Sequence, residues 1–127
     1  MDAPSLLVVD DDPGILAMLV DCLRDTGHPV AGVASVEAAV AALARDRYAL
    51  VLADAFHDLL GPHDDRWAAL ERLRRAAAPA PVVIVSGHRE ETFAGWAERG
   101  FAGHLPKPFD LDDLLATVRS CLDHAAP

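Results

Sequence analysis

Three consecutive carboxylates, Asp10-Asp11-Asp12, come directly after the uncharged segment Ser5–Val9 and directly before Pro13. A short apolar run of this kind is typical of a buried parallel strand, which would deliver several negative charges to one edge of a sheet. Like charges this close repel one another unless a cation lies among them. Hard oxygen ligands at a strand end favour Mg²⁺ above other ions. The sequence therefore predicts that Asp10 and Asp11 hold a divalent cation.

Asp12 has a simpler interpretation than its two neighbours. Asp is a preferred N-cap and Pro a preferred first residue of a helix, so Asp12 is predicted to cap a helix that starts at Pro13. Helix capping explains Asp12 but does not explain Asp10 and Asp11. We therefore keep the metal-binding interpretation for Asp10 and Asp11.

Apolar runs that predict strands alternate along the chain with apolar residues at helical spacing. The expected strands cover residues 5–9, 30–34, 48–53, 81–85 and 101–105, and the expected helices begin after Asp12, Ser35, the loop that follows Asp54, Gly87 and Asp110. Five strand-then-helix units predict a parallel sheet with right-handed crossovers and helices on both faces. In such sheets ligands bind beyond the carboxyl ends of the strands.

Further polar residues follow the other predicted strands and converge on the same edge. Asp54 ends the third run, Ser86 and Gly87 follow the fourth, and Lys107 follows the fifth. Asp54, on a central strand, is placed to attack phosphorus, because carboxylates form aspartyl phosphates. The Lys107 ammonium would pair with one phosphoryl oxygen and the Ser86 hydroxyl would donate to another, with Gly87 leaving room beside them.

The motifs on this edge resemble the receiver domain of two-component response regulators. The matching strings are Leu7-Val8-Val9-Asp10-Asp11, Leu50-Val51-Leu52-Ala53-Asp54, Val83-Ile84-Val85-Ser86-Gly87 and Leu105-Pro106-Lys107-Pro108-Phe109. The resemblance runs from Leu6 to Leu122. It implies a flavodoxin-like (βα)5 fold, an α/β doubly wound parallel five-stranded sheet with strand order 2-1-3-4-5. We expect a single domain over residues 1–127, with its core at about 5–123.

The resemblance also implies the roles of the acidic residues. Asp54 would accept a phosphoryl group from a histidine kinase or phosphotransfer protein, with Mg²⁺ as the cofactor and Mn²⁺ as an alternative ion. Asp11 would bind the metal directly and Asp10 mainly through water. The backbone carbonyl of Phe56 would complete the protein ligands.

By the same resemblance, Ser86 and Lys107 would respond to the phosphoryl group, and the Lys107–Pro108 peptide would be cis. The response would switch the face formed by the helix at 89–99, the strand at 101–105 and the last helix, for binding of an unidentified output protein or domain. The protein would then be no enzyme beyond catalysing its own phosphorylation and dephosphorylation. Homodimerisation on phosphorylation stays an open alternative.

Several positions depart from the family pattern. The loop Phe56–Asp65 carries about four extra residues, which either alter contacts with the metal or a partner or are a tolerated surface insertion. His104 stands where the family has a Tyr or Phe that rotates inward; it either switches, with a charge that responds to pH near about 6.5, or is a surface residue. Phe56 and His88 flank the path of the hydrolytic water, and the bulk of Phe56 is expected to slow loss of the phosphoryl group.

Two other functions stay open at this point. The first is a haloacid-dehalogenase-like phosphatase with Asp10 as nucleophile and Asp12 as general acid, although that enzyme would leave Asp54 without a role. The second is a receiver-like docking module that works independently of phosphorylation. The presence of Asp54 and Lys107 argues against such a module.

Composition and charge indicate where the protein is located and which partners it does not bind. No apolar stretch of the 127 residues approaches the roughly 20 that a membrane span needs, and Met1–Pro4 does not resemble a signal peptide, so we expect a cytoplasmic location. A formal net charge of −9 opposes contact of this domain with nucleic acid or an anionic membrane. Cys22 and Cys121 lack the spacing of metal ligands and are expected to be reduced thiols.

Overall fold

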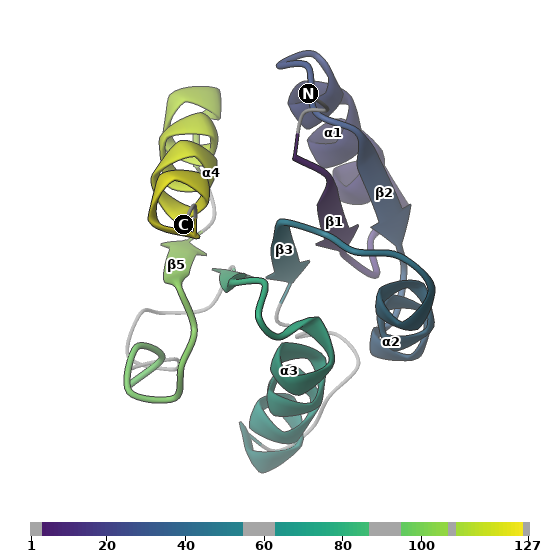
Figure 1. Cartoon of the computed structure of the whole chain (residues 1–127), viewed down its shortest axis with the longest axis vertical. Coiled ribbons are helices and arrows are strands. Elements are labelled where there is room, and N and C mark those ends of the chain that lie inside the picture. The colour runs from purple at the N-terminus through teal and green to yellow at the C-terminus, as the bar shows by residue number, and fades with distance from the viewer. Residues whose placement is uncertain (1–3, 55–62, 87–94, 107–108, 126–127) are drawn as a thin grey trace.

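Four helices and five strands are found in the computed structural model, which describes residues 4–54, 63–86, 95–106 and 109–125 (Figure 1). They are β1 (Leu6–Val9), α1 (Pro13–Arg24), β2 (Val30–Val33), α2 (Val36–Arg45), β3 (Leu50–Asp54), α3 (His63–Ala77), β4 (Val82–Ser86), β5 (Gly103–Pro106) and α4 (Leu111–Ala125). The strands form one sheet in the order β2-β1-β3-β4-β5, and every neighbouring pair is parallel. The predicted fold class and strand order are confirmed.

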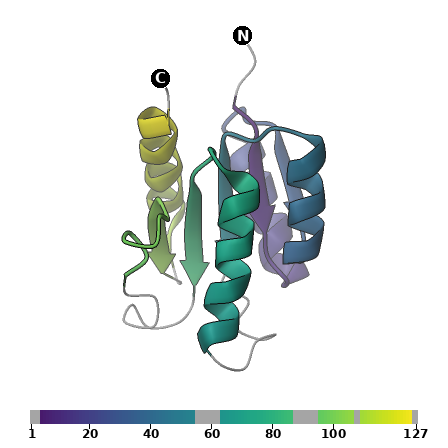
Figure 2. The same ribbon diagram turned by 60° about the horizontal axis from the view of Figure 1, so that its bottom comes forward.

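Two layers of helices cover the sheet, because alternate residues of each strand point to opposite faces. Leu7 and Val9 of β1 pack with α2 and α3, whereas Leu6 and Val8 pack with α1 and α4. Figure 2 shows α2 and α3 in front of the sheet and the other two helices behind it. The central strands are therefore buried on both sides, as their uninterrupted apolar sequences predict.

All strands run in the same direction, which gives the sheet two different edges. We call the edge at which the strands end the carboxyl edge and the edge at which they begin the amino edge. Each helix returns the chain from the carboxyl edge to the amino edge. The N-termini of the helices therefore lie at the carboxyl edge and their C-termini at the amino edge.

Three predicted helix caps are confirmed. The Asp12 carboxylate accepts from the backbone N–H of Gly14 at 2.9 Å and of Ile15 at 3.1 Å. The Ser35 hydroxyl oxygen accepts from Ala38 N–H at 3.1 Å, and the Asp110 carboxylate accepts from Asp113 N–H at 2.8 Å. Each cap satisfies a donor that the first turn of a helix leaves open, and so fixes where the chain leaves the carboxyl edge.

The prediction of a helix through Arg99 is wrong for residues 95–99, which form hydrogen-bonded turns; residues 87–94 lie outside the described part of the chain. Gly95 has φ +88°, a left-handed conformation that interrupts a right-handed helix, and Gly100 has φ +96°. Trp96 nevertheless packs against the core on the α2 and α3 side. β5 begins at Gly103, two positions later than predicted, while Phe101 is buried in that same core.

Candidate functional site

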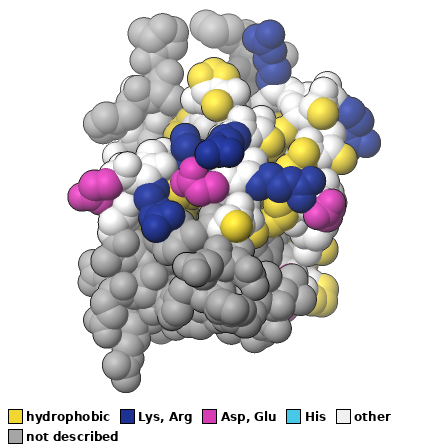
Figure 3. Space-filling model, turned by 90° about the horizontal axis from the view of Figure 1, so that it is seen from below, with side chains coloured by type: hydrophobic (Ala, Val, Ile, Leu, Met, Phe, Trp, Pro, Cys, Tyr) yellow, Lys and Arg dark blue, Asp and Glu magenta, His cyan; other side chains and the backbone are white. Residues whose placement is uncertain are grey.

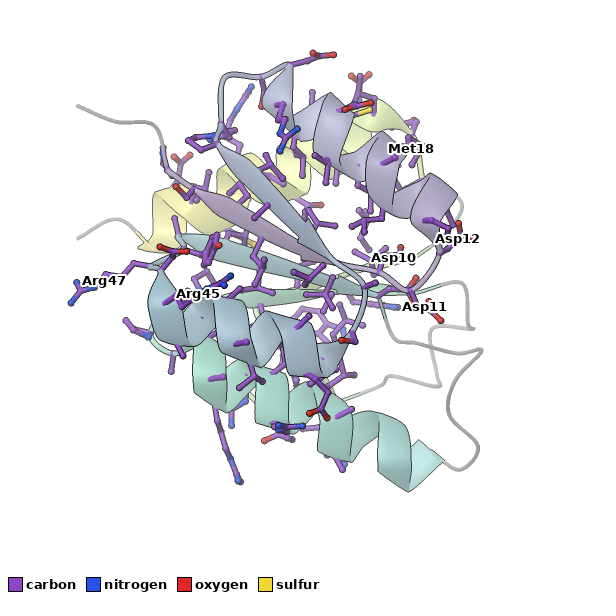
Figure 4. The ribbon with its side chains drawn as sticks, turned by 90° about the vertical axis from the view of Figure 1, so that its right-hand side faces the viewer. Asp10, Asp11, Asp12, Met18, Arg45 and Arg47 are labelled. Atoms are coloured by element: carbon purple, nitrogen blue, oxygen red, sulfur yellow. The ribbon has the colours of Figure 1, made fainter. Side chains whose placement is uncertain are left out.

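The carboxyl edge brings together the ends of β1, β3 and β4. Val9 pairs with Ala53, and Asp54 pairs with Val85, so Asp10 and Asp54 lie beside each other on neighbouring central strands. Figure 4 shows Asp10 and Asp11 where β1 ends and Asp12 where α1 begins. The placement predicted for these carboxylates is thus found in the structure.

Asp10, Asp11 and Asp54 form a compact cluster of carboxylates. Each offers one oxygen, and these oxygens all lie within 4.8 Å of one another. Asp10 is 0% exposed and Asp54 2% exposed, whereas Asp11 is half-buried. Removing negative charges from water at this separation is costly unless a cation compensates them.

The donor set fits Mg²⁺ better than a transition metal. It consists of carboxylate oxygens, with no thiolate or imidazole among the described residues of the cluster. Mg²⁺ prefers such hard ligands, and it is usually held by only one or two carboxylates while keeping several waters. Asp11 is the carboxylate of the cluster that keeps contact with solvent.

Backbone hydrogen bonds hold Asp10 in place. The N–H of Asp12 donates to Oδ1 of Asp10 at 2.9 Å, and the N–H of Asp10 donates to the carbonyl oxygen of Val33 at 3.1 Å. The first contact is an Asx turn, which Asp residues make with the backbone two positions on. Sequence reasoning missed this support, although an Asp two residues before a helix cap is its signal.

Asp12 does not belong to the cluster. Its Oδ1 is engaged by the N–H groups of Gly14 and Ile15, and its side chain is exposed. The acidic run therefore divides as the sequence predicted in one respect: Asp12 caps a helix, and Asp10 and Asp11 belong to the carboxylate cluster. Metal binding by Asp10 and Asp11 stays a prediction.

Several predicted site residues fall outside the described part of the chain: Phe56, Gly87, His88, Lys107 and Pro108. The metal-ligating carbonyl of Phe56 and the cis Lys107–Pro108 peptide stay predictions; within the described residues, the cis peptide is Ala78–Pro79. Ser86 ends β4 and pairs with Pro106 of β5, which places its backbone at the carboxyl edge.

His104 lies within β5, opposite Ile84 of β4, and is half-buried. A position in an edge strand next to the site suits a residue that responds to the site, but the switching role itself stays a prediction.

The two cysteines are free thiols, as predicted. Cys121 is 9% exposed in the core between α4 and the sheet, and burial raises the pKa of its thiol because the thiolate would lose its hydration. Cys22 is half-buried against the same core. Both lie away from the acidic cluster, so neither contributes to it.

A membrane-spanning segment is not found in the described residues, since none of their helices combines the necessary length and apolar character.

Comparison with known proteins places these features in a family. Residues 6–119 match the family model for the response regulator receiver domain. Over 122 residues the chain is 30% identical to the nitrogen assimilation regulatory protein NtrX of Azorhizobium caulinodans, covering 95% of this chain and 26% of the relative. It is 35% identical over 117 residues to the transcriptional regulatory protein TcrA of Mycobacterium tuberculosis, covering 91% and 44% respectively.

A solved structure gives the same picture. The crystal structure of NtrX from Brucella abortus in complex with ADP superposes with a TM-score of 0.84 at 29% identity, over 97% of this chain and 27% of that chain. The chain thus spans between about a quarter and under half of the length of these relatives.

Proposed function

This chain belongs to the response regulator receiver domains of two-component signalling, which are signalling domains and not enzymes in the usual sense, and we propose that Asp54 is its phosphoacceptor. The donor is the phosphohistidine of a histidine kinase or phosphotransfer protein. One Asp54 oxygen forms a bond to phosphorus while the phosphorus–nitrogen bond of the donor breaks, and the electron pair of that bond stays on the imidazole nitrogen.

The observation that carries this proposal is the burial of Asp54 beside Asp10 within one three-carboxylate cluster. Asp11 and Asp10 are the proposed holders of Mg²⁺, the first directly and the second mainly through water, with the Phe56 carbonyl completing the set. When bound, Mg²⁺ supplies positive charge that offsets the carboxylates and the phosphoryl oxygens. Mn²⁺ is the expected substitute, since it takes the same oxygen ligands.

The division of roles among the carboxylates argues against the phosphatase alternative. That enzyme needs Asp10 as nucleophile, which leaves the buried Asp54 of the same cluster without a role. It also needs Asp12 as a proton donor, but the Asp12 carboxylate caps α1 and lies outside the cluster. Asp54, at the end of a central strand, is left as the nucleophile.

The proposed response starts at the ends of β4 and β5. The Ser86 hydroxyl and the Lys107 ammonium would each contact a phosphoryl oxygen, with Gly87 leaving space. Movement of these groups would reach His104 and change the face formed by residues 95–100, β5 and α4, which an output protein or domain then binds. We propose that this happens in the cytoplasm, within one domain over residues 1–127, and without direct contact with nucleic acid or membrane.

We further propose that the protein catalyses its own dephosphorylation, with water attacking phosphorus in line with the Asp54 oxygen. By the family resemblance, the side chains of Phe56 and His88 would flank that path. Phe56→Asn should shorten the lifetime of the phosphorylated protein several-fold; an unchanged lifetime would remove Phe56 from this role.

The decisive experiment is incubation of the protein with acetyl phosphate and Mg²⁺, followed by intact-mass spectrometry. Wild type should gain one phosphoryl adduct, and Asp54→Asn should gain none. Loss of the adduct in Asp10→Asn combined with its retention in Asp54→Asn would support the phosphatase instead. A wild type that gains no adduct, although it binds Mg²⁺, would support the docking module.

The role of Lys107 can be read separately, because it is the only lysine in the sequence. Reductive methylation with ¹³C-formaldehyde labels this amine and the N-terminal amine and keeps both charges. Phosphorylation should shift the side-chain methyl resonance of Lys107 in wild type and leave it in place in Asp54→Asn.

A further inference from the structure

The amino edge of the sheet, opposite the proposed site, carries a hollow of about 800 Å³. Its walls are the α2–β3 connection, the α3–β4 connection and the last turns of α4, and they include Leu43, Tyr48, Pro79 and Leu122. Most of the lining is apolar, and Arg47 is the charged residue among the lining residues. A volume of this size is enough for one or more large side chains.

Arg47 lines this hollow and two further arginines lie near it in the sequence, with the exposed C-cap residue Asp46 between Arg45 and Arg47. Arg45 ends α2, Arg47 follows the C-cap of that helix, and Arg75 lies in the last turn of α3 next to the lining residue Ala76. All three are exposed, and within the described part of the chain none of them forms an ion pair. Arg72 and Arg74, by contrast, pair with Glu37 at 2.8 Å and Glu71 at 3.0 Å.

The figures place some of these arginines. Arg side chains gather on the face seen in Figure 3, over α2 and α3, with Asp and Glu side chains among them. Arg45 and Arg47 lie at one end of the molecule in Figure 4, and Asp10, Asp11 and Asp12 lie at the other. For a protein with a formal net charge of −9, an apolar hollow with unpaired arginines around it is an exception.

The carboxyl edge presents a matching segment. Leu111, the first residue of α4, is 50% exposed, more than any other large apolar side chain of the described residues. Asp112 and Asp113 follow it in the first turn of the helix and are also exposed. An exposed leucine next to two carboxylates has the chemistry that an apolar hollow with an arginine rim would bind.

We propose that Leu111 of one copy enters the amino-edge hollow of a second copy, with Asp112 and Asp113 facing Arg45 and Arg47 of that copy. The two surfaces lie at opposite ends of the strands, so the contact is heterologous and joins molecules head to tail. One side chain in one hollow makes a small interface, and we therefore expect a weak, rapidly exchanging association.

This self-association needs neither Mg²⁺ nor phosphorylation. It is tested on unphosphorylated protein in EDTA. A protein that does not self-associate would therefore leave the proposed role of Asp54 unaffected, and a protein that is not phosphorylated at Asp54 would leave the self-association unaffected.

Sedimentation equilibrium measures the association directly. The weight-average mass of wild type should rise with concentration between about 10 µM and about 1 mM, the range expected of a small interface. Leu111→Ala should weaken the association at least about fivefold, whereas Met18→Ala, which truncates an apolar side chain that is 47% exposed on α1, should leave it unchanged. A wild type with the mass of a monomer throughout this range overturns the proposal.

A charge exchange tests the pairing of the two edges. The variants Arg45→Glu/Arg47→Glu and Asp112→Arg/Asp113→Arg should each be monomeric alone, because each presents like charges at both edges. Their equimolar mixture should associate, since every contact between unlike molecules is again complementary. Arg119→Glu, a charge reversal on the exposed side of α4, should behave as wild type. The melting temperatures of the variants show whether they are folded. If the variants melt at the wild-type temperature but their mixture stays monomeric, the proposal is overturned.

Discussion

Both edges of the sheet carry exposed charged side chains at helix ends, and burial sets the acidic cluster apart from them. At the amino edge, Arg45 and Arg75 lie in the last turns of helices and are exposed. At the carboxyl edge, Asp12 and Asp110 cap helices and are also exposed. Both sets lie where the helix dipole favours their sign, so fold stability alone accounts for them.

Asp10 and Asp54 break this symmetry. They cap no helix, they are almost fully buried, and they share a cluster with Asp11. A charge at a helix end is common, whereas carboxylates buried together are rare and mark a candidate functional site. Burial, and not the number of charges, separates the clustered carboxylates of Asp10 and Asp54 from the carboxylates that cap helices.

Removing one carboxylate should have the largest effect on the carboxyl edge. Asp10→Asn and Asp11→Asn should each weaken Mg²⁺ binding between about tenfold and a hundredfold, or about 1.4 to 2.7 kcal/mol, measured by isothermal titration calorimetry. Asp12→Asn is the matched control, because asparagine still caps α1 and the residue lies outside the cluster. An equal loss in this control would contradict the division of roles.

At the amino edge, the corresponding large effect should come from Gly100. Its φ of +96° costs a residue with a Cβ about 1 to 2 kcal/mol, and that Cβ would also lie 3.2 Å from Arg74 Nη1. Gly27→Ala is the control: φ there is +95°, and nothing lies within 4 Å of the added atom. Urea unfolding should show both variants destabilised and Gly100→Ala more so; the opposite order would rule out the contact with Arg74.

A smaller effect is expected from the cap at Asp12. Asp12→Ala should lower the free energy of unfolding by about 1 kcal/mol, because Gly14 and Ile15 each lose an acceptor for their N–H groups. Asp12→Asn should restore most of this. Urea unfolding in EDTA separates the cap from any metal effect, and equal stability of Asp12→Ala and wild type would be inconsistent with it.

The smallest effect should come from the exposed pair of Glu37 and Arg72. The hydrogen bond and charge of Arg72 lower the pKa of Glu37 below its usual 4.5. A carboxyl group whose pKa is lower in the folded protein than in the unfolded protein stabilises the fold at pH values above its unfolded-state pKa. This stabilisation is lost as the pH falls through the folded-state pKa. The melting temperatures of wild type and Glu37→Gln should therefore differ slightly at neutral pH and converge as pH falls below the lowered pKa of Glu37. A difference in melting temperature that grows as the pH falls would contradict a lowered pKa of Glu37.

Local chemistry made much of the fold predictable. Asp12 and Ser35 were identified as caps from residue type and position alone, and the structure confirms both. The uninterrupted apolar sequences of β1, β3 and β4 indicated buried parallel strands, because no side of these strands faces solvent. The strand order came from the family resemblance and is confirmed.

Features that depend on tertiary assembly could not be predicted in this way. The left-handed conformation of Gly95, which limits the expected fourth helix, has no local signal that separates it from an ordinary helical glycine. The amino-edge hollow is assembled from Arg47, Pro79 and Leu122, which come from three distant segments with no common motif. The acidic cluster was predictable because its members lie at the ends of two strands of one parallel sheet, Asp54 as the last residue of β3 and Asp10 and Asp11 directly after β1.

The position of the phosphoryl group on the chain tests the central claim most directly. After treatment with acetyl phosphate and Mg²⁺, borohydride reduces an aspartyl phosphate to homoserine, and peptide sequencing by tandem mass spectrometry locates it. We predict homoserine at Asp54 and at no other aspartate. Homoserine at Asp10 with Asp54 intact would contradict the account.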